Sequence, residues 1–430
     1  MLMLISTIAK RHRLASLPLL TVFCLSAVTV HASAKQANAK PNAKQGAPTQ
    51  LSKDSVANAV TEHARQSRFP NKLKFVDKSG NTRNGIVEYT FDDKVHTDMA
   101  SVYLKYQPDY ACFVAVDVET GAILNLTSFI KSDEQFDNLV MRSDYPAASV
   151  FKMITAAAGL DLGKVSPATV IPFNGKSTTL YKKQVLNHKK NKWTRNPTFK
   201  ESFAKSINAV FGRIGVFELG AKNINKYAQR FGFDKPMLTD FNLPSSKVGL
   251  SFEDEWELAE AASGYTKDIT ISPIHAAQMA AIVANDGKMV TPYMVESVHN
   301  ERGQKIYNGG GQVATEQVIS QDSAKALRTL MTETTRIGSA RKSFQGLSRY
   351  KVYKDMEIGG KTGSLTGYSP KGRHDWFVGY AEKNGRKVAY ASLIINKEKW
   401  YVRSAYVARQ FIYHFYTDLA AQAEVTAAAE

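Results

Sequence analysis

The chain of 430 residues contains few of the groups that build disulfides and metal sites. It has two cysteines, and Cys24 lies in the N-terminal apolar run described below, which leaves Cys112 without an internal partner. With apolar neighbours on both sides, Cys112 is expected to be a small buried residue. The nine histidines are scattered, and no pair has metal-ligand spacing. The sequence therefore implies no disulfide framework, no metal and no other cofactor.

Acidic residues are also scarce, with 39 carboxylates against 56 lysines and arginines and a formal charge of +17. In a cytosolic protein such a surplus often indicates nucleic-acid binding. For an exported protein the expected partners are instead anionic wall polymers or lipid headgroups, with a diffuse solvated surface as the alternative. The basic segment 182–192 is interpreted as an exposed loop, and polymer binding is its alternative. The sequence leaves the oligomeric state open.

Apolar runs long enough to approach the width of a bilayer are absent after the first thirty residues. A basic cluster, Lys10 to Arg13, precedes the apolar run Leu14–Val30, and Ala32-Ser33-Ala34 offers the small residues that signal peptidase accepts. Residues 1–34 are therefore predicted to be a signal peptide, and an uncleaved membrane anchor is the alternative. We expect an exported protein that is periplasmic or associated with the cell wall.

Composition divides the rest of the chain. Residues 35–50 have no aromatic side chain and are rich in Ala, Lys, Asn and Gln, which predicts a flexible linker. Residues 51–84 are predicted to form a small N-terminal appendage and residues 85–419 the main domain. The Ala/Glu-rich segment 420–430 is expected to be a disordered tail.

Within the main domain, strand patterns come first, helical patterns occupy the middle, and strands with a helix close the chain. This order predicts an α/β fold of the α+β type, in which an antiparallel sheet is flanked by helices and an all-helical subdomain is inserted. The predicted hairpins cover 111–126, with a turn at 119–121, and 376–395, with a turn at Asn384-Gly385. The predicted helices cover 149–162, 202–219, 272–287, 322–335 and 404–419.

Three short motifs carry candidate chemistry. In the first, Ser149 and Lys152 lie one turn apart on the same face at the start of a helix. A serine hydroxyl becomes a useful nucleophile when a base accepts its proton, and a lysine does so when burial and neighbouring cations lower its pKa. The helix N-terminus also favours negative charge at that position. Taken alone, such a pair occurs by chance in most proteins of this size.

The other two motifs follow in order along the chain. The second contains Ser206, suited to relaying a proton, and Asn208, suited to binding a substrate carbonyl. The third, Lys361-Thr362-Gly363-Ser364, places an ammonium and two hydroxyls beside a glycine that allows close backbone approach. These groups suit a substrate carboxylate. The phosphate-binding loop pattern fails, because Asp355 stands where an earlier glycine is required.

Together, the three motifs resemble those of the transpeptidase domain of penicillin-binding proteins over roughly 86–417. The resemblance implies that Ser149 is acylated with Lys152 as its base, while Ser206 and Lys361 pass the proton to the leaving amine. It further implies that Asn208 holds the substrate amide and that Thr362, Gly363 and Ser364 bind the terminal carboxylate. The backbone N–H groups of Ser149 and Ser364 would form the oxyanion hole.

The expected substrates are therefore D-alanyl-D-alanine stem peptides of peptidoglycan, and β-lactams are expected to bind covalently. Two features depart from the family pattern: Ala147-Ala148 before the nucleophile, where glycine is frequent, and the segment 335–340. His374-Asp375 is interpreted as positioning a loop, and Arg373 as an auxiliary carboxylate ligand or a solvated cation. The alternatives to a D,D-transpeptidase are a D-alanyl-D-alanine carboxypeptidase, a serine β-lactamase and a non-catalytic wall-binding or sensor protein.

Overall fold

The computed structural model describes residues 50–132, 137–187, 189–310 and 316–429. The predicted signal peptide at 1–34 and all but the last residue of the predicted linker at 35–50 lie outside these residues. Within the described ranges, no helix has both the length and the hydropathy needed to cross a bilayer.

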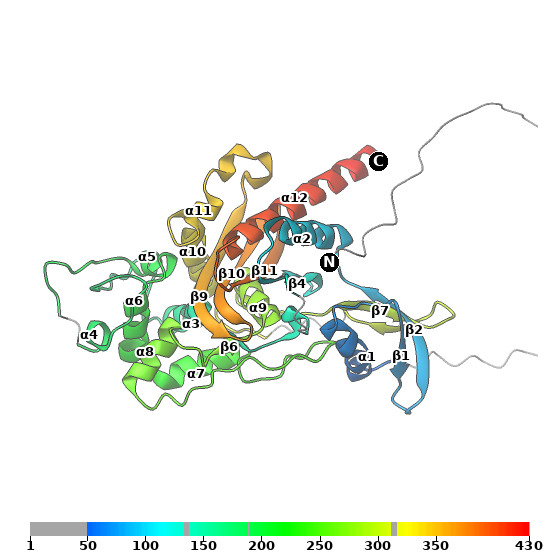
Figure 1. Cartoon of the computed structure of the whole chain (residues 1–430), viewed down its shortest axis with the longest axis horizontal. Helices are drawn as coiled ribbons and strands as arrows, with labels where there is room; N and C mark the ends of the chain where they lie inside the picture. The colour runs from blue at the N-terminus through cyan, green and yellow to red at the C-terminus, as the bar shows by residue number, and fades with distance from the viewer. Residues whose placement is uncertain (1–49, 133–136, 188, 311–315, 430) are drawn as a thin grey trace, which may run out of the picture. The chain divides into compact units, whose positions relative to one another are not determined.

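A five-stranded antiparallel sheet is built from both ends of the main domain, as predicted (Figure 1). Its strand order is β4-β3-β11-β10-β9, so that β9 is an edge strand. The predicted hairpins are confirmed as the pairs β3–β4 and β10–β11. The strands are β3 (Tyr110–Asp117), β4 (Ile123–Ile130), β9 (Glu357–Tyr368), β10 (Lys371–Lys383) and β11 (Arg386–Asn396).

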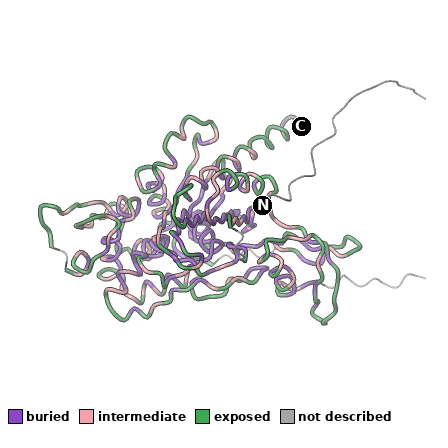
Figure 2. Tube along the Cα trace, viewed as in Figure 1, coloured by how far each residue is buried: buried purple, intermediate pink, exposed green. Residues whose placement is uncertain are grey.

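Both faces of this sheet are covered, which explains why all eight residues of β3 are buried. Alternate side chains point to opposite faces: Cys112 and Val114 pack with the larger core, while Phe113 packs with the smaller one. Helix α9 (Pro273–Ala284) covers the first face and is buried along its length (Figure 2). Burial of Cys112 is therefore confirmed.

The second face is covered by α2 (Asp93–Tyr106) and α12 (Ser404–Ala429) (Figure 1). Helix α12 extends ten residues beyond the predicted end at Leu419. Where the sequence predicted a disordered tail at 420–430, the chain is therefore helical as far as Ala429. Alanine has the highest intrinsic helix propensity, and this segment is rich in it.

Helices inserted between β4 and β9 form the predicted helical region. The predicted helix at 202–219 is interrupted, because α5 ends at Ala204 and Ser206 adopts a left-handed conformation with φ of 55° before α6 begins. The helices are α3 (Lys152–Asp161), α4 (Lys182–Val185), α5 (Phe199–Ala204), α6 (Asn208–Arg213), a π-helix (Ile214–Leu219), α7 (Gly220–Arg230), α8 (Glu255–Ser263), α10 (Gln321–Arg336) and α11 (Arg341–Phe344).

A second antiparallel sheet, of order β1-β2-β7-β8, joins the predicted appendage to the middle of the chain. The predicted boundary at 84/85 falls inside β2, which pairs with β7, so the appendage shares a sheet with the main domain. Its elements are α1 (Lys53–Arg65), β1 (Lys72–Val76), β2 (Thr82–Tyr89), β7 (Val295–His299) and β8 (Lys305–Asn308). Strand β5 (Tyr145–Pro146), just before the first motif, pairs with β6 (Thr270–Ile271). The 3₁₀ turns are Leu139–Met141, Ala148–Phe151, Leu347–Arg349 and Lys351–Tyr353.

Candidate active site

Ser149 lies in the 3₁₀ turn that leads into α3, and the chain before it is held on two sides. The indole N–H of Trp376 on β10 donates to the Pro146 carbonyl at 3.0 Å, and the Ala147 N–H donates to the Ile269 carbonyl at 2.9 Å. Ala148 then takes a left-handed conformation with φ of 48°, which costs an L-residue about 1–2 kcal/mol. The fold thus fixes the backbone on which the Ser149 side chain stands.

Lys152 is fully buried one turn after Ser149. Its Nζ lies 2.7 Å from Ser149 Oγ and 2.7 Å from Asn208 Oδ1, and it also donates to the Ser263 carbonyl. Burial, followed by the positive charge of Lys361, holds the pKa of Lys152 well below its ordinary value of 10.5. Both causes favour the neutral amine more than water does.

The three partners of Lys152 fix the direction of these hydrogen bonds when the amine is neutral. The Asn208 and Ser263 oxygens can only accept, so they take the two N–H groups of the amine. Its lone pair is then left to accept the Ser149 hydroxyl proton. The amide orientation of Asn208 agrees, because Nδ2 donates to the Thr178 carbonyl at 2.9 Å.

Lys361 on β9 is a second buried lysine, and it meets Ser206 at the break between α5 and α6. Its Nζ donates to Ser206 Oγ at 2.9 Å and to the Thr362 carbonyl at 2.9 Å. Burial lowers the pKa of Lys361 to about 7. A proton on this lysine is therefore held weakly enough to be exchanged with Ser206 near neutral pH.

The hydroxyls of Thr362 and Ser364 are each hydrogen-bonded to a neighbouring side chain. Thr362 Oγ1 lies 2.5 Å from Ser339 Oγ, and Arg373 Nε donates to Ser364 Oγ at 2.8 Å. Between them, a Cβ on Gly363 would lie 3.0 Å from Val150 Cγ2 and 3.2 Å from the Val150 nitrogen, so glycine allows β9 to approach the turn that carries Ser149.

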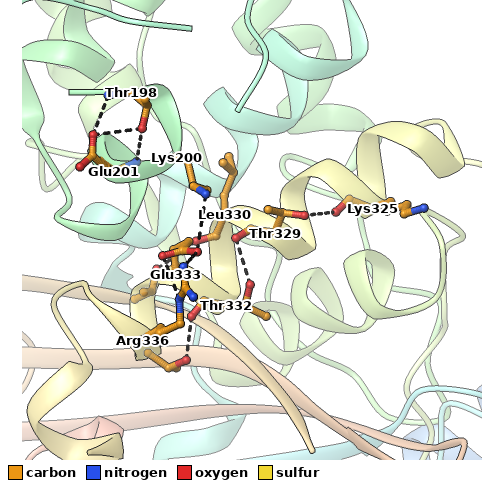
Figure 3. Close-up of polar contacts among 11 residues, drawn as sticks. Thr198, Lys200, Glu201, Lys325, Thr329, Leu330, Thr332, Glu333 and Arg336 are labelled. Atoms are coloured by element: carbon orange, nitrogen blue, oxygen red, sulfur yellow. Dashed lines mark hydrogen bonds and ion pairs between the residues drawn. The ribbon is translucent and has the colours of Figure 1, made fainter. Parts of the chain in front are cut away.

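Ion pairs to the buried Glu333 link α10 to α5, the helices that precede Ser339 and Ser206 (Figure 3). Glu333 on α10 has 7% of its side chain exposed and pairs with Arg336 at 2.6 Å and with Lys200 on α5 at 3.7 Å. After α10, the Ser339 N–H donates to the Ala204 carbonyl at the end of α5. The turns at Ser206 and Ser339 are thereby held in one relative position.

These residues surround a cleft of about 740 Å³. Six of the eight predicted site residues line it: Ser149, Ser206, Asn208, Thr362, Gly363 and Ser364. The side chains of Lys152 and Lys361 are buried behind this surface, and hydrogen bonds connect them to Ser149 and Ser206. The structure therefore brings all eight predicted residues together.

His374 and Asp375 do not join this hydrogen-bonded group. His374 is buried, its Nε2 lies 2.9 Å from the Pro370 carbonyl oxygen, and burial lowers its pKa to about 4. Asp375 accepts from the N–H and the hydroxyl of Ser404 at the start of α12. These contacts agree with a positioning role. Arg373 lies at the cleft and holds Ser364, as described above.

Sequence reasoning missed several residues of the cleft. Ser263 contributes only a carbonyl oxygen, which no side-chain pattern indicates, although Gly264 after it carries the signal of a helix C-cap and adopts a φ of 62°. Ser339 lies in the segment noted as a departure from the family pattern. The other missed residues lining the cleft include Tyr265, Lys342, Trp400 and Arg403.

Comparisons with known proteins agree with the geometry. The family described as penicillin binding protein transpeptidase domain matches residues 111–413. Peptidoglycan D,D-transpeptidase PbpA of Mycobacterium tuberculosis is 27% identical over 328 residues, which cover 68% of this chain and 63% of that protein. Stage V sporulation protein D of Bacillus subtilis is 28% identical over 301 residues, covering 65% of this chain and 44% of that protein. The chain thus covers less than two thirds of the length of these relatives.

Solved structures share the fold. The D,D-transpeptidase domain of a peptidoglycan glycosyltransferase from Eggerthella lenta superposes with a TM-score of 0.62 at 20% identity, covering 80% of this chain and 94% of that one. An imipenem acyl-enzyme complex of penicillin-binding protein A from M. tuberculosis gives a TM-score of 0.61 at 23% identity and covers 82% of each chain.

Proposed function

Because the chain belongs to the penicillin-binding protein transpeptidase family, we propose that it is a peptidoglycan D,D-transpeptidase that works through an acyl-enzyme on Ser149. The observation that carries this proposal is the 2.7 Å contact between Ser149 Oγ and a buried lysine whose other two partners can only accept. That arrangement directs the lysine lone pair at the serine proton. The relatives named D,D-transpeptidase and the acyl-enzyme complex of a structural neighbour support the same chemistry.

In the acylation step, Ser149 Oγ attacks the carbonyl carbon of the penultimate D-alanine and gives its proton to Lys152 Nζ. We assign the oxyanion to the backbone N–H groups of Ser149 and Ser364, a type of contact whose loss typically costs about 10²–10³ in rate. The C–N bond then breaks, and the departing D-alanine nitrogen receives a proton through Ser206 and Lys361. Asn208 holds the donor amide, and the hydroxyls of Thr362 and Ser364 bind the terminal carboxylate, with the positive charge of Lys361 behind them.

In the second step the amine of another stem peptide attacks the Ser149 ester and loses a proton through Ser206 to Lys361, and the ester C–O bond breaks as Lys152 returns its proton to Ser149 Oγ. A β-lactam follows only the first step, since its ring amide opens on Ser149 and leaves a stable ester. We further propose that residues 1–34 direct export and that the enzyme acts in the periplasm or at the cell wall, where its substrate lies.

Labelling of the full chain with a fluorescent penicillin tests the proposal. We expect a covalent adduct on a denaturing gel that is stable for minutes, is lost in Ser149→Ala, and is unchanged in Ser79→Ala, an exposed serine outside the cleft. An adduct that disappears within seconds would indicate a β-lactamase instead. Absence of any adduct would indicate a non-catalytic protein, and transfer of the donor peptide to water alone would indicate a carboxypeptidase.

A further inference from the structure

The cleft has a cationic surface beyond the groups that the proposed reaction uses. Among the described residues that line it are four further cations, Lys205, Lys342, Arg373 and Arg403, and a single carboxylate, Asp375. That carboxylate already accepts two hydrogen bonds from Ser404. The surface of the cleft therefore attracts anionic groups.

One part of this surface, the outer rim, consists of Arg373, Trp400 and Arg403. The Arg403 guanidinium lies 3.7 Å from the centre of the Trp400 ring, and 60% of the Arg403 side chain is exposed. The distance from its Nη1 to Asp375 Oδ1 is 3.9 Å, which is longer than a hydrogen bond. Contact with the ring restrains the guanidinium without using its N–H groups, which favours paired hydrogen bonds to a carboxylate.

The outer rim continues away from Ser149. Arg373 also lines an adjoining cavity of about 550 Å³, together with Lys371 and Lys397 and with the Tyr368 ring. No acidic side chain is found among the described residues that line this second cavity. A substrate that extends past Ser364 therefore meets a continuous basic surface with exposed aromatic rings.

The terminal carboxylate of the donor does not need this surface, because Thr362, Ser364 and Lys361 are assigned to it. We infer that the outer rim is a subsite for a second carboxylate of the acyl donor, carried by a residue that precedes D-alanyl-D-alanine. The inference rests on the proposed function and names its substrate class: stem peptides with a free internal carboxylate, in preference to the same peptides with that group amidated.

Two synthetic donors test the inference. They end in D-alanyl-D-alanine and are identical except that the preceding residue carries a carboxylate in one and a carboxamide in the other. For the full-length enzyme at low salt, we expect kcat/KM for D-alanine release to favour the acidic donor about tenfold, mainly through KM, as the loss of one charge-assisted contact predicts. Arg403→Gln should remove this preference, Arg403→Lys should retain part of it, and Arg302→Gln in the distant β7–β8 turn should leave it intact.

Equal kcat/KM values for the two donors in the unaltered enzyme would overturn the inference. It would also be overturned if Arg403→Gln lowered kcat/KM for both donors by the same factor. Penicillin labelling separates this failure from that of the proposed function. An unaltered enzyme that labels normally but releases D-alanine from both donors at equal rates overturns the subsite alone. An unaltered enzyme that fails to label overturns the reaction on which the subsite depends.

Discussion

The two ends of the cleft hold basic side chains in opposite surroundings. At the inner end, formed by Lys152 and Lys361 with Ser206 and Asn208, both lysine side chains are completely buried. At the outer rim, 60% of the Arg403 side chain is exposed. Burial depresses the pKa of both lysines, whereas an arginine keeps its charge in any of these surroundings.

The comparison shows how basic side chains serve two purposes. A desolvated amine gains or loses a proton near neutral pH, so it can take part in covalent chemistry. A solvated guanidinium stacked on an aromatic ring can only attract and orient an anion. The inner end is therefore suited to proton transfer and the outer rim to binding, and three changes test this division.

The largest effect is expected from Lys152→Met, which keeps the volume of the side chain but removes the base. Acylation by penicillin should slow by about 10²–10⁴-fold, the usual contribution of a general base. The measurement is the rate of adduct formation, with thermal unfolding as the control for folding. Arg403→Met serves as the matched change at the outer rim and should alter this rate far less. A Lys152→Met enzyme that acylates within tenfold of the unaltered enzyme would contradict the division.

Much of the fold was predictable because local signals and tertiary packing agree. Ser272 caps α9 and accepts from the His275 N–H, with Pro273 at the first helical position, and Asn384-Gly385 joins β10 to β11. The break near Ser206 was not predictable, since the apolar residues continue through 202–219 with helical spacing. Its left-handed backbone is held by tertiary contacts such as the Lys361 hydrogen bond.

For the site, the sequence indicated which side chains carry chemistry but not what holds them. The three motifs lie more than fifty residues apart and meet only through the fold. The Ser263 carbonyl acts through the backbone, and Ser339 acts through Thr362, so neither has a recognisable sequence pattern. The outer rim was missed for another reason: Trp400 and Arg403 look like ordinary loop residues until α12 places them beside Arg373.

The second prediction concerns pH. Acylation by the peptide donor requires neutral Lys152 and protonated Lys361, so kcat/KM should fall on the acid side as Lys152 gains a proton. It should also fall above about pH 7, where Lys361 loses its proton. On each side of the maximum, kcat/KM should change by nearly tenfold per pH unit.

The measurement for this prediction is a profile of D-alanine release between pH 5 and 10. Arg403→Gln should preserve both limbs of the profile, because it leaves Lys152 and Lys361 and their hydrogen-bond partners unchanged. A profile of the unaltered enzyme that stays flat from pH 6 to pH 9 would show that the buried lysines do not control the reaction.

The smallest effect is expected where the two ends meet, at the hydrogen bond between Ser339 and Thr362. Ser339→Ala leaves the Thr362 hydroxyl without this partner, at a cost of about 1 kcal/mol in binding the donor carboxylate, or a factor of about five. KM for the peptide donor should rise by that factor while kcat stays close to its original value, because the proton path through Lys152 is untouched. Thr329→Ala, on the exposed face of α10, the helix that precedes Ser339, is the matched control. A fall in kcat with KM unchanged would instead place Ser339 with the proton-transfer groups of the inner end. The boundary between the two regions would then lie closer to the outer rim.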